Sequence, residues 1–377
     1  MRASIDHILF TGGGTAGHLF PGLAVAEELK RVAPQLRISF AGSGKAFEAE
    51  HVGRAGYPYV AIPCRPLPRK ATETLRFLKD NFHGYYAARN LLREQDVSLV
   101  VGLGGYASVP ASRAAARLGV PYILLEQNAV PGRATRWLAP GAALVCSALE
   151  GLHTQLRAGC RVRVTGNPLR RAFIKRHTPA NLVPSRMGRT RRLVVLGGSG
   201  GSNTLNTQVP FALYKAGPAL HDWQIVHQTG ERNAAATGLL YRKLGIRATV
   251  APFIGNLPEV LRSSHLAVSR AGGTTLAELA ASGLPAVLLP YPQAADDHQR
   301  KNADVFAAAG GAELVDQREV DGRLDNHLAG TIVGIATDHL LRARKAEAMQ
   351  RMARPEATRT VAEAIIALLA AREPAAI

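Results

Sequence analysis

The sequence predicts an α/β fold with two doubly wound parallel-sheet domains that face each other across a cleft. Three observations predict it. Short apolar runs alternate with helix-length amphipathic segments along nearly the whole chain, which is typical of parallel sheets covered by helices. The alternation stops over residues 167–192 and restarts at Leu193. With 377 residues, the chain is also longer than the ~250–300 residues that single cores seldom exceed.

The predicted strands of the first half are short and apolar, as expected for strands buried on both faces of a parallel sheet. They are Ile8–Phe10, Ile38–Ala41, Tyr59–Ile62, Leu99–Gly102, Tyr122–Leu125, Ala143–Cys146 and Val162–Thr165. Helical patterns such as Gly22–Val32, Thr72–Arg93 and Ala111–Leu118 lie between them. The first domain is therefore expected over residues 1–166.

A second series of strands predicts a second domain over residues 193–355. Its strands are Leu193–Leu196, Gln224–His227, Thr249–Pro252, Leu266–Val268, Ala286–Leu289 and Glu313–Val315. Before it, residues 167–192 hold three prolines and eight Arg or Lys residues without apolar periodicity, which predicts a basic linker. The Ala/Leu-rich pattern Glu356–Ala371 predicts a helix that fits either domain, and we assign the segment 356–377 to the first.

The composition excludes several classes of protein. A hydrophobic fraction of 47% is too high for a mainly disordered chain. Three cysteines without metal-binding spacing predict neither a disulfide framework nor a zinc site, and they fit a reducing compartment. No run approaches the ~20 apolar residues that span a bilayer, and no signal-peptide pattern is present, so a soluble or peripheral protein is expected. The net charge of +18 suits nucleic acid, an anionic membrane or a phosphorylated substrate.

A glycine cluster follows the first predicted strand. Gly12, Gly14 and Gly17 form a GxGxxG pattern, which lets backbone N–H groups approach an anion at a helix N-terminus. A nicotinamide-binding domain would place an acid at the end of its second strand to hold the ribose. Here that strand ends Phe40-Ala-Gly-Ser-Gly44 and the next acid is Glu48, so dinucleotide binding is not favoured. A purely structural tight turn remains the alternative.

Two further glycine clusters follow strands, at residues 102–105 and 197–201. After the first of them, Ser108 is the expected N-cap of a helix, and Pro110 fits its first turn. Tyr106 is expected at an exposed loop tip, although tyrosine is as often a core residue. Three such loops exceed what simple turns require. They indicate a ligand that bears phosphates, bound between the two domains.

A turn at Gly272-Gly273 follows a further strand, and Thr274 or Thr275 is expected to begin a helix. The N-terminus of that helix would stabilise a diphosphate. Glu278, one turn later, would repel a diphosphate, so we expect it to accept hydrogen bonds from ribose hydroxyls. A solvated glutamate is the alternative.

A polar cluster follows the next strand. Asp297, His298, Gln299 and Asn302 are residue types that hydrogen-bond sugar hydroxyls. Two carboxylates beside one histidine also suggest a metal. However, adjacent positions do not converge readily on one ion, so no metal is expected.

Taken together, these motifs resemble the MurG family of bacterial peptidoglycan enzymes, which belong to glycosyltransferase family 28. The motifs that carry the resemblance are residues 13–26, 104–106, 126–128, 165–168, 197–199, 252–254, 270–278, 297–299 and Asn302. They span essentially the whole chain in the family's order. The resemblance implies a GT-B fold of two Rossmann-like domains. It implies inverting transfer of GlcNAc from UDP-GlcNAc to the muramyl-pentapeptide of undecaprenyl-pyrophosphate-linked lipid I, forming lipid II, without a cofactor.

The resemblance also implies site residues, with the donor on the second domain and the acceptor on the first. The implied donor residues are Thr15, Ala16, Gly17, Asn128, Arg170, Ser199, Ile254, Gly273, Thr274, Thr275, Glu278, His298, Gln299 and Asn302. The implied acceptor residues are Gly14, His18, Gly104, Gly105, Tyr106, Glu126 and Asn128. Ile254 would lie near the uracil, and Arg170 near the diphosphate. Gly200 stands where the family usually has Gln, which alters one phosphate or sugar contact.

Inversion at the anomeric carbon requires a base that takes the proton of the acceptor hydroxyl. His18 is the expected base, because an ordinary imidazole pKa of about 6.5 suits neutral pH. Glu126 is the alternative, and Tyr106 completes the expected catalytic set. The sequence has no Asp-x-Asp motif placed to hold a metal, so helix N-termini and basic side chains are expected to stabilise the leaving UDP.

A lipid-linked acceptor implies a peripheral protein at the cytoplasmic face of the plasma membrane. An apolar helical face of Leu75, Leu78, Phe82 and Tyr85 lies beside Arg69, Lys70, Arg76 and Lys79. Such a helix suits anionic lipid, although burial of this face in the domain core is about equally common.

Another GT-B UDP-sugar enzyme, such as a glycolipid glycosyltransferase or a UDP-GlcNAc 2-epimerase, is the nearest alternative function. A nucleic-acid-binding protein would interleave aromatic with basic residues, and the stretches Arg157–Arg163 and Arg186–Arg192 contain no aromatic residue. The expected partners are UDP-GlcNAc, lipid I and an anionic membrane surface, without nucleic acid.

Overall fold

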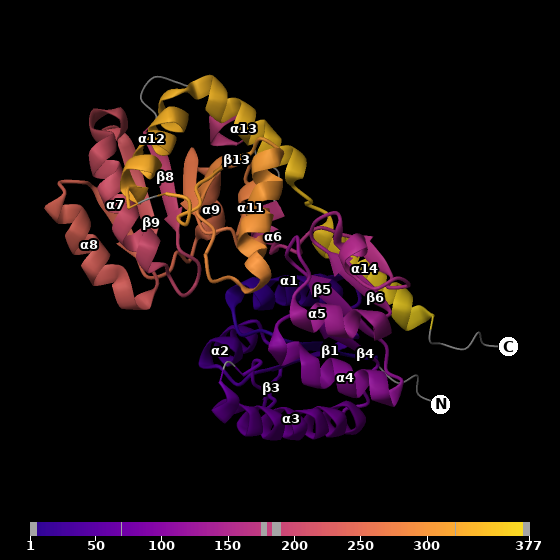
Figure 1. The fold of residues 1–377 in the computed structure, drawn as a ribbon. Helices are drawn as coiled ribbons and strands as arrows, with labels where there is room; N and C mark the ends of the chain where they lie inside the picture. Colours follow the sequence, from indigo (N-terminus) through magenta and orange to yellow (C-terminus); the bar gives the residue numbers. More distant parts are fainter. Residues whose placement is uncertain (1–5, 69, 175–178, 183–189, 321, 372–377) are drawn as a thin grey trace. The chain divides into compact units, whose positions relative to one another are not determined.

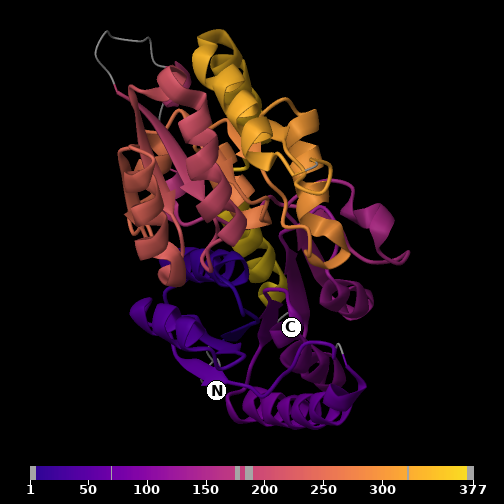
Figure 2. The ribbon, with the colours of Figure 1, turned by 60° about the vertical axis from the view of Figure 1, so that its left-hand side comes forward.

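The protein consists of two compact α/β units, each built on its own parallel sheet with helices on both faces (Figures 1 and 2). The computed structural model describes residues 6–68, 70–174, 179–182, 190–320 and 322–371. Unit 1 comprises Met1–Arg170 and Arg354–Ile377, and unit 2 comprises Arg171–Ala353. All strand pairs in the described residues are parallel, which confirms the predicted fold class.

The sheet of unit 1 has seven strands in the order β3-β2-β1-β4-β5-β6-β7. Their bounds are β1 (His7–Thr11), β2 (Arg37–Gly42), β3 (Tyr59–Ala61), β4 (Leu99–Gly102), β5 (Tyr122–Glu126), β6 (Leu144–Ser147) and β7 (Val162–Val164). Each matches a predicted strand to within one residue. The strand order reverses at β1, because β2 and β4 pair with its two edges. Open α/β sheets bind ligands at such a reversal, outside the carboxyl ends of the strands.

The helices of unit 1 are α1 (Ala16–Val32), α2 (Ala46–Arg54), α3 (Thr74–Glu94), α4 (Val109–Leu118), α5 (Arg133–Leu138) and α14 (Ala357–Ala370). Short 3₁₀ helices cover Ala71–Glu73, Tyr106–Ser108, Ala139–Gly141 and Leu152–Gln155. The chain returns to unit 1 with α14, which lies beside α1 (Figure 1). Val361 and Ile365 of α14 share a core cluster with Val25 and Leu29 of α1, and this burial fixes the C-terminal helix in unit 1.

The sequence predicted one linker over residues 167–192, whereas the described parts of this segment belong to the two units. In unit 1, the Leu169 backbone N–H donates to Thr358 Oγ1 at 2.9 Å. In unit 2, α6 (Arg171–Ile174) and the 3₁₀ helix Ala180–Leu182 are formed, and Asn181 Nδ2 donates to the carbonyl of His265 at 2.8 Å. Residues 175–178 and 183–189 lie outside the described residues.

The sheet of unit 2 has six strands in the order β10-β9-β8-β11-β12-β13. They are β8 (Arg191–Leu196), β9 (Trp223–Gln228), β10 (Ala248–Ala251), β11 (Leu266–Ser269), β12 (Ala286–Leu288) and β13 (Ala312–Leu314). Each matches a predicted strand to within two residues, and here the order reverses at β8. One apolar core joins this sheet to its covering helices, among them Leu205 of α7 and Ile332 of α12.

The helices of unit 2, in addition to α6, are α7 (Asn203–Ala216), α8 (Ala234–Lys243), α9 (Leu257–Arg262), α10 (Gly273–Ala281), α11 (His298–Ala308), α12 (Leu324–Thr337) and α13 (His339–Met352). Further 3₁₀ helices cover Gly217–Leu220, Glu231–Asn233 and Ala295–Asp297. Within the residues described in both units, no helix is long and apolar enough to cross a bilayer.

Candidate functional site

The glycine loop after β1 packs directly against the glycine loop after β4. Gly12, Gly13 and Gly14 all have positive φ, at 130°, 134° and 84°. A Cβ on Gly12 would lie 2.9 Å from the carbonyl oxygen of Gly104, so only glycine permits this approach. The two predicted loops therefore form one structure at the point where the strand order of unit 1 reverses.

His18 lies in the first turn of α1, beside both glycine loops. Thr15 Oγ1 lies 3.0 Å from His18 Nδ1, which fixes the plane of the half-buried imidazole ring. A Cβ on Gly104 would lie 3.0 Å from His18 Cδ2, so the ring packs against the second loop. The structure thus brings together three groups of predicted residues, Gly14–Gly17, His18 and Gly104–Gly105.

Glu126 ends β5 and organises the loop that follows it. Its Oε1 accepts from the N–H and the Nδ2 of Asn128, at 3.1 and 3.0 Å. Its Oε2 accepts from the N–H of Gly132 at 3.0 Å and from Thr135 Oγ1 at 2.6 Å. A buried carboxylate with four donors is already fully used as an acceptor. This pattern fits a residue that positions Asn128 better than it fits a general base.

Of the two expectations about the second glycine loop, the one about Ser108 and Pro110 is confirmed and the one about Tyr106 is wrong. Ser108 is the N-cap residue of α4 and Pro110 lies in its first turn, although the Ser108 hydroxyl donates to the carbonyl of Gly105 at 2.8 Å and makes no side-chain capping bond. A 3₁₀ turn over Tyr106–Ser108 precedes the helix, and it takes up the backbone groups that a cap would satisfy. The turn leaves Tyr106 half-buried rather than at an exposed tip.

Glu48 is a site residue that the sequence did not reveal. In the sequence, Glu48 is only the first acid after the second strand, too far along the chain to hold a ribose. In the structure its side chain reaches back from α2 and accepts from the N–H of Gly14 at 2.5 Å. The first glycine loop therefore does not offer that N–H to an anion. A single sequence carries no signal for this contact, because it depends on how α2 packs on the loop.

In unit 2, the loops after β8, β9 and β10 are tied together. A Cβ on Gly201 would lie 1.9 Å from the carbonyl oxygen of Thr229, so the first two loops touch through their backbones. Gln228 Nε2 donates to the carbonyl of Gly198 at 3.2 Å, and its Oε1 accepts from the N–H of Ile254 at 3.0 Å. Ser199 and Gly200 are exposed at the tip of the first loop, and Ile254 is buried.

Arg270, directly after β11, is a buried cation beside the first of these loops. Its Nε donates to Ser202 Oγ at 3.0 Å, and its guanidinium also donates to the carbonyls of Leu289 and Pro290. Burial lowers the pKa of Arg270 to about 10, so it remains charged at neutral pH. Ser202 in turn caps α7 by accepting from the N–H of Leu205. This positive charge is held by neutral acceptors at the carboxyl ends of the strands.

The helix predicted after Gly272 is α10, and it begins at Gly273 rather than at a threonine, with Gly272 as N-cap. Glycine at the N-cap leaves the first backbone N–H groups accessible at the positive end of the helix dipole. Thr274 is buried and Thr275 is half-buried in its first turn. Glu278 is buried rather than solvated, which excludes the alternative of an exposed glutamate.

The polar cluster of residues 297–302 is partly structural. Gln299 Oε1 accepts from the N–H groups of Ala271 and Tyr291, at 3.3 and 2.9 Å. Asn302 is fully buried, and its Nδ2 donates to the carbonyl of Ala271 at 3.0 Å. Asn302 thus holds the loop in front of α10 and does not face an open site. His298 is half-buried at the start of α11.

The turn that leads into α11 has strained backbone. Asp296 and Asp297 have φ of 52° and 54°, which non-glycine residues adopt at a cost. Arg318 donates to the carboxylates of Asp297 and Asp316, at 3.2 and 2.6 Å, and holds the pKa of Asp316 well below its usual range. The carboxylates of this cluster are thus engaged by arginine. Among the described residues, no group of three or more His, Cys, Asp or Glu side chains is arranged to hold a metal.

The side chains predicted to form the apolar face of α3 differ in their exposure to solvent. Leu75, Leu78 and Phe82 are 80%, 57% and 61% exposed, so they do not belong to the domain core. Tyr85 was expected on the same face, but it is half-buried against the core, and Tyr86 is exposed instead. At about 100° per residue, position 85 lies at the edge of the exposed stripe, next to the row of the buried residues Ala88 and Leu92. Lys70, Arg76 and Lys79 are exposed beside this face, and Arg69 lies outside the described residues.

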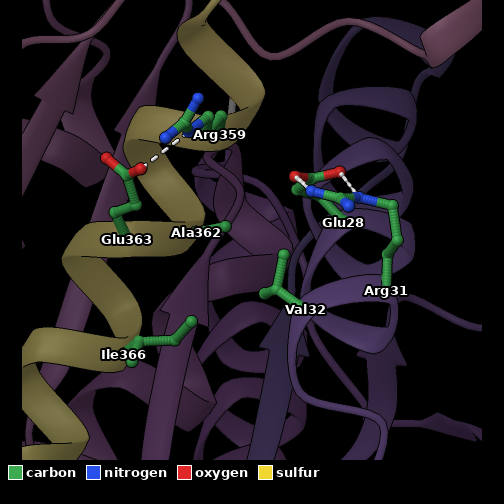
Figure 3. A pocket seen from close by; sticks show the side chains of 7 residues that line it. All are labelled: Glu28, Arg31, Val32, Arg359, Ala362, Glu363 and Ile366. Carbon is green, nitrogen blue, oxygen red and sulfur yellow. Dashed lines mark hydrogen bonds and ion pairs between the residues drawn. The ribbon is translucent and has the colours of Figure 1, made fainter.

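A groove between α1 and α14 lies at the far end of α1 from His18 (Figure 3). Figure 3 shows α14 lining it from one side and α1 from the other. Its residues are Glu28, Arg31, Val32, Arg359, Ala362, Glu363 and Ile366. Arg31 pairs with Glu28 at 2.7 Å and Arg359 with Glu363 at 2.8 Å. Each arginine thus forms an ion pair with a glutamate of its own helix. None of the predicted site residues lines the groove.

The two parallel-sheet units, with glycine-rich loops at the carboxyl ends of their strands, define a protein of the GT-B fold class. The chain belongs to glycosyltransferase family 28. Residues 8–146 match the glycosyltransferase family 28 N-terminal domain, and residues 192–361 match the glycosyltransferase family 28 C-terminal domain. Both domains of the family are therefore represented, one in each unit.

Individual relatives agree with this assignment. A protein of Geobacter sulfurreducens named UDP-N-acetylglucosamine–N-acetylmuramyl-(pentapeptide) pyrophosphoryl-undecaprenol N-acetylglucosamine transferase is 35% identical, over 96% of this chain and 98% of its own length. The crystal structure of Acinetobacter baumannii MurG has a TM-score of 0.75 at 28% identity, with 96% and 99% of the two chains covered. A UDP-N-acetylglucosamine 2-epimerase structure has a TM-score of 0.67 at 14% identity, covering 98% and 97%, and shares the fold alone.

Proposed function

We propose that this chain transfers N-acetylglucosamine from UDP-GlcNAc to lipid I, the undecaprenyl-pyrophosphate-linked MurNAc-pentapeptide, and forms lipid II. The observation that carries the proposal is the end-to-end match with a relative named for this transfer, which covers both units. A chain that lacked one of the two units would match only part of that relative, whereas this chain covers 98% of its length. The epimerase alternative rests on fold likeness at 14% identity, which carries no information about activity.

Unit 2 is the proposed donor unit. The accessible N-terminus of α10 and the buried charge of Arg270 both favour a diphosphate in front of the loops after β8 and β11. Glu278, with its two acceptor oxygens, is the proposed partner of the ribose hydroxyls. Ile254 is proposed to lie at the uracil, and Ser199, Thr274 and Thr275 at the phosphates. Asn302 is proposed to support the donor site indirectly, because it is buried and its Nδ2 donates to the carbonyl of Ala271 in the loop before α10.

Unit 1 is the proposed acceptor unit, with His18 as the general base. The proton of the acceptor hydroxyl is proposed to pass to Nε2 of His18, because Nδ1 lies 3.0 Å from Thr15 Oγ1. Attack by that oxygen forms the new glycosidic bond while the bond to UDP breaks, which inverts the anomeric carbon. No cofactor is needed for this displacement. Tyr106, Gly104, Gly105 and Asn128 are proposed to line the acceptor.

The exposed face of α3, defined by Leu75, Leu78, Phe82 and Tyr86, is the proposed contact with the anionic membrane that carries lipid I. Large apolar side chains exposed on one helix, flanked by Lys70, Arg76 and Lys79, suit insertion at a charged bilayer surface. We place the protein at the cytoplasmic face of the membrane, where UDP-GlcNAc is available. Nucleic acid is not among the proposed partners.

The proposal is tested by incubating the purified chain with UDP-GlcNAc and a lipid I analogue, and by measuring the disaccharide lipid product and released UDP. Parallel reactions contain diacylglycerol or no acceptor. Product with the lipid I analogue alone is the expected result. Glycolipid formed from diacylglycerol would identify a glycolipid glycosyltransferase, and conversion of UDP-GlcNAc to UDP-ManNAc without any acceptor would identify an epimerase.

A further inference from the structure

The carboxylate of Glu48 is completely buried beneath the first glycine loop of unit 1 and accepts three hydrogen bonds. The N–H of Gly14 donates to Oε1 at 2.5 Å, and Ser43 Oγ donates to the same oxygen at 2.7 Å. The hydroxyl of Tyr59 donates to Oε2 at 2.6 Å. All three partners are donors, as required by a carboxylate that acts only as an acceptor. Hydrogen bonds to a carboxylate are stronger than those between neutral groups.

The surrounding backbone is shaped to admit this carboxylate. A Cβ on Gly13 would lie 2.9 Å from Glu48 Oε1, and a Cβ on Gly42 would lie 2.5 Å from Oε2. Neither position therefore accepts a side chain while Glu48 is in place. Burial and the hydrogen bond to Glu48 raise the pKa of Tyr59, which keeps its hydroxyl protonated as a donor. The arrangement is a built site for one carboxylate rather than an incidental contact.

Residues of α2 and its N-cap hold Gly14 at both of its backbone polar groups. Glu48 accepts from its N–H, and Lys45 Nζ donates to its carbonyl at 3.0 Å. Gly14 is flexible by itself, because glycine with a φ of 84° has no side chain to restrict it. The next residue, Thr15, is the N-cap of α1 and contacts His18 Nδ1. Contacts therefore run without a break from Glu48 through Gly14 and Thr15 to the imidazole.

We propose that Glu48 is a positioning residue for the transfer reaction, which fixes the Gly14 peptide and thereby the Thr15–His18 contact that orients the base. The inference rests on the proposed function for its kinetic consequences, because His18 is assigned as the base there. Glu48 itself does not touch substrate, since it is buried under the loop. Its effect is on the placement of the base, and a misplacement of ~1 Å lowers rates by up to about 100-fold.

The test compares Glu48→Gln with Glu50→Gln, a matched change at an exposed position of the same helix, where the carboxylate pairs with Arg54. Glu48→Gln is expected to lower kcat by about 10- to 100-fold and to leave the KM for UDP-GlcNAc within about twofold, because the donor binds unit 2. Glu50→Gln is expected to match the wild type. A kcat of Glu48→Gln within twofold of the wild type overturns the proposal.

A second measurement needs no substrate, so it separates this inference from the proposed function. In NMR spectra, the Gly14 amide proton is expected far downfield and protected from exchange in the wild type and in Glu50→Gln. In Glu48→Gln, it is expected to move upfield and exchange faster, and the His18 imidazole signals are expected to shift with it. Unchanged His18 signals would overturn the inference even if the wild type makes lipid II. A wild type that makes no product would refute the function, while these signals still decide the role of Glu48.

Tyr59→Phe and Ser43→Ala keep the test decisive if Glu48→Gln does not fold. Each removes one donor and retains the carboxylate, so each is expected to shift the Gly14 and His18 signals in the same direction and to lower kcat by about three- to tenfold. Circular dichroism measures the folded fraction of each variant. A loss of kcat in proportion to the loss of folded protein would show a purely structural role and would overturn the proposal.

Discussion

At the scale of single residues, the hydrogen bonds of Glu126 bear on the choice between His18 and Glu126 as the base. The Nδ1 of His18 contacts Thr15, and its ring lies against the second glycine loop. Both oxygens of Glu126 accept from its own following loop. A base must have a lone pair directed at its substrate, and four loop donors occupy the lone pairs of Glu126. The hydrogen bonds of Glu126 therefore count against it as the base.

We therefore expect His18→Ala to lower kcat by about 10²- to 10⁴-fold and to abolish the fall in kcat/KM that protonation of a base causes at acidic pH. Glu126→Gln is expected to retain that fall and to lose activity through a displaced Asn128. The measurement is the pH profile of lipid II formation, with exposed His153→Ala as control. Near-normal turnover of His18→Ala with an unchanged pH profile would remove His18 from this role.

A second residue-scale prediction concerns His227, which is buried in unit 2 between Tyr241 and Asn206. Burial lowers its pKa to about 3, against about 6.5 in an unfolded chain. Between these values the unfolded state binds more protons, so stability is fully present above the unfolded pKa and is lost as the pH falls toward 3. From about pH 7 to about pH 5, this single group is expected to remove about 2 kcal/mol from the unfolding free energy of unit 2.

The measurement is urea unfolding followed by the fluorescence of buried Trp223, with and without His227→Gln in a Trp137→Phe background. Glutamine does not titrate, so the variant is expected to lose less stability over this range, whatever its stability at neutral pH. Equal pH dependence in the two proteins would contradict the assignment.

At the scale of elements, the position of α3 depends on one glycine. A Cβ on Gly84 would lie 1.9 Å from the carbonyl oxygen of Pro63, so the helix and the preceding segment approach through bare backbone. Gly84→Ala is expected to destabilise unit 1 by about 2–3 kcal/mol, because the backbone must shift. Gly53→Ala on α2 has nothing within 4 Å of its new methyl group and is expected to stabilise by about 0.5–1 kcal/mol. Thermal unfolding of the two variants measures whether Gly84→Ala lowers and Gly53→Ala raises the stability. Equal changes in stability would contradict the close approach of Gly84 to the Pro63 carbonyl.

The outer face of α3 carries a further prediction. Phe82→Glu places a negative charge in the exposed apolar stripe and is expected to reduce binding to anionic vesicles at least tenfold, because it removes apolar area and repels the lipid. Phe211→Glu on α7 is the matched control, since its ring is also exposed but lies on unit 2. Co-sedimentation with vesicles at several salt concentrations measures both. Salt-independent binding, or equal loss in the two variants, would contradict a membrane role for α3.

At the scale of the whole molecule, each unit has its own core and its own tryptophan, with Trp137 in unit 1 and Trp223 in unit 2. A ligand that binds only one unit stabilises that unit by mass action. UDP at about 100 times its Kd is expected to raise the unfolding free energy of unit 2 by about 2.7 kcal/mol. Trp223 fluorescence in Trp137→Phe should report this shift, and Trp137 fluorescence in Trp223→Phe should not. A shift confined to Trp137 would reverse the assignment of donor and acceptor units.

Much of the architecture was predictable from the sequence because it rests on local patterns. Strands such as Leu99–Gly102 are continuous apolar runs bounded by turn residues, and this pattern is typical of strands with both faces buried. The glycine loops were also predictable, since Gly12 and Gly104 stand directly after strands. The identity of most candidate site residues followed from the family resemblance of their motifs.

Local sequence patterns were therefore enough to predict the order of the elements, the two parallel-sheet units and the glycine-rich loops at the strand ends. Three features became visible only in the folded protein. Glu48 binds the N–H of Gly14 in the first glycine loop, Glu126 and Asn302 make hydrogen bonds to neighbouring loops, and Tyr86 rather than Tyr85 is exposed. The difference lies in the sequence separation of the interacting residues. Periodicity and turn chemistry are set by neighbours along the chain, whereas the partner of a buried polar group is set by packing between distant segments, as for Gly14 and Glu48.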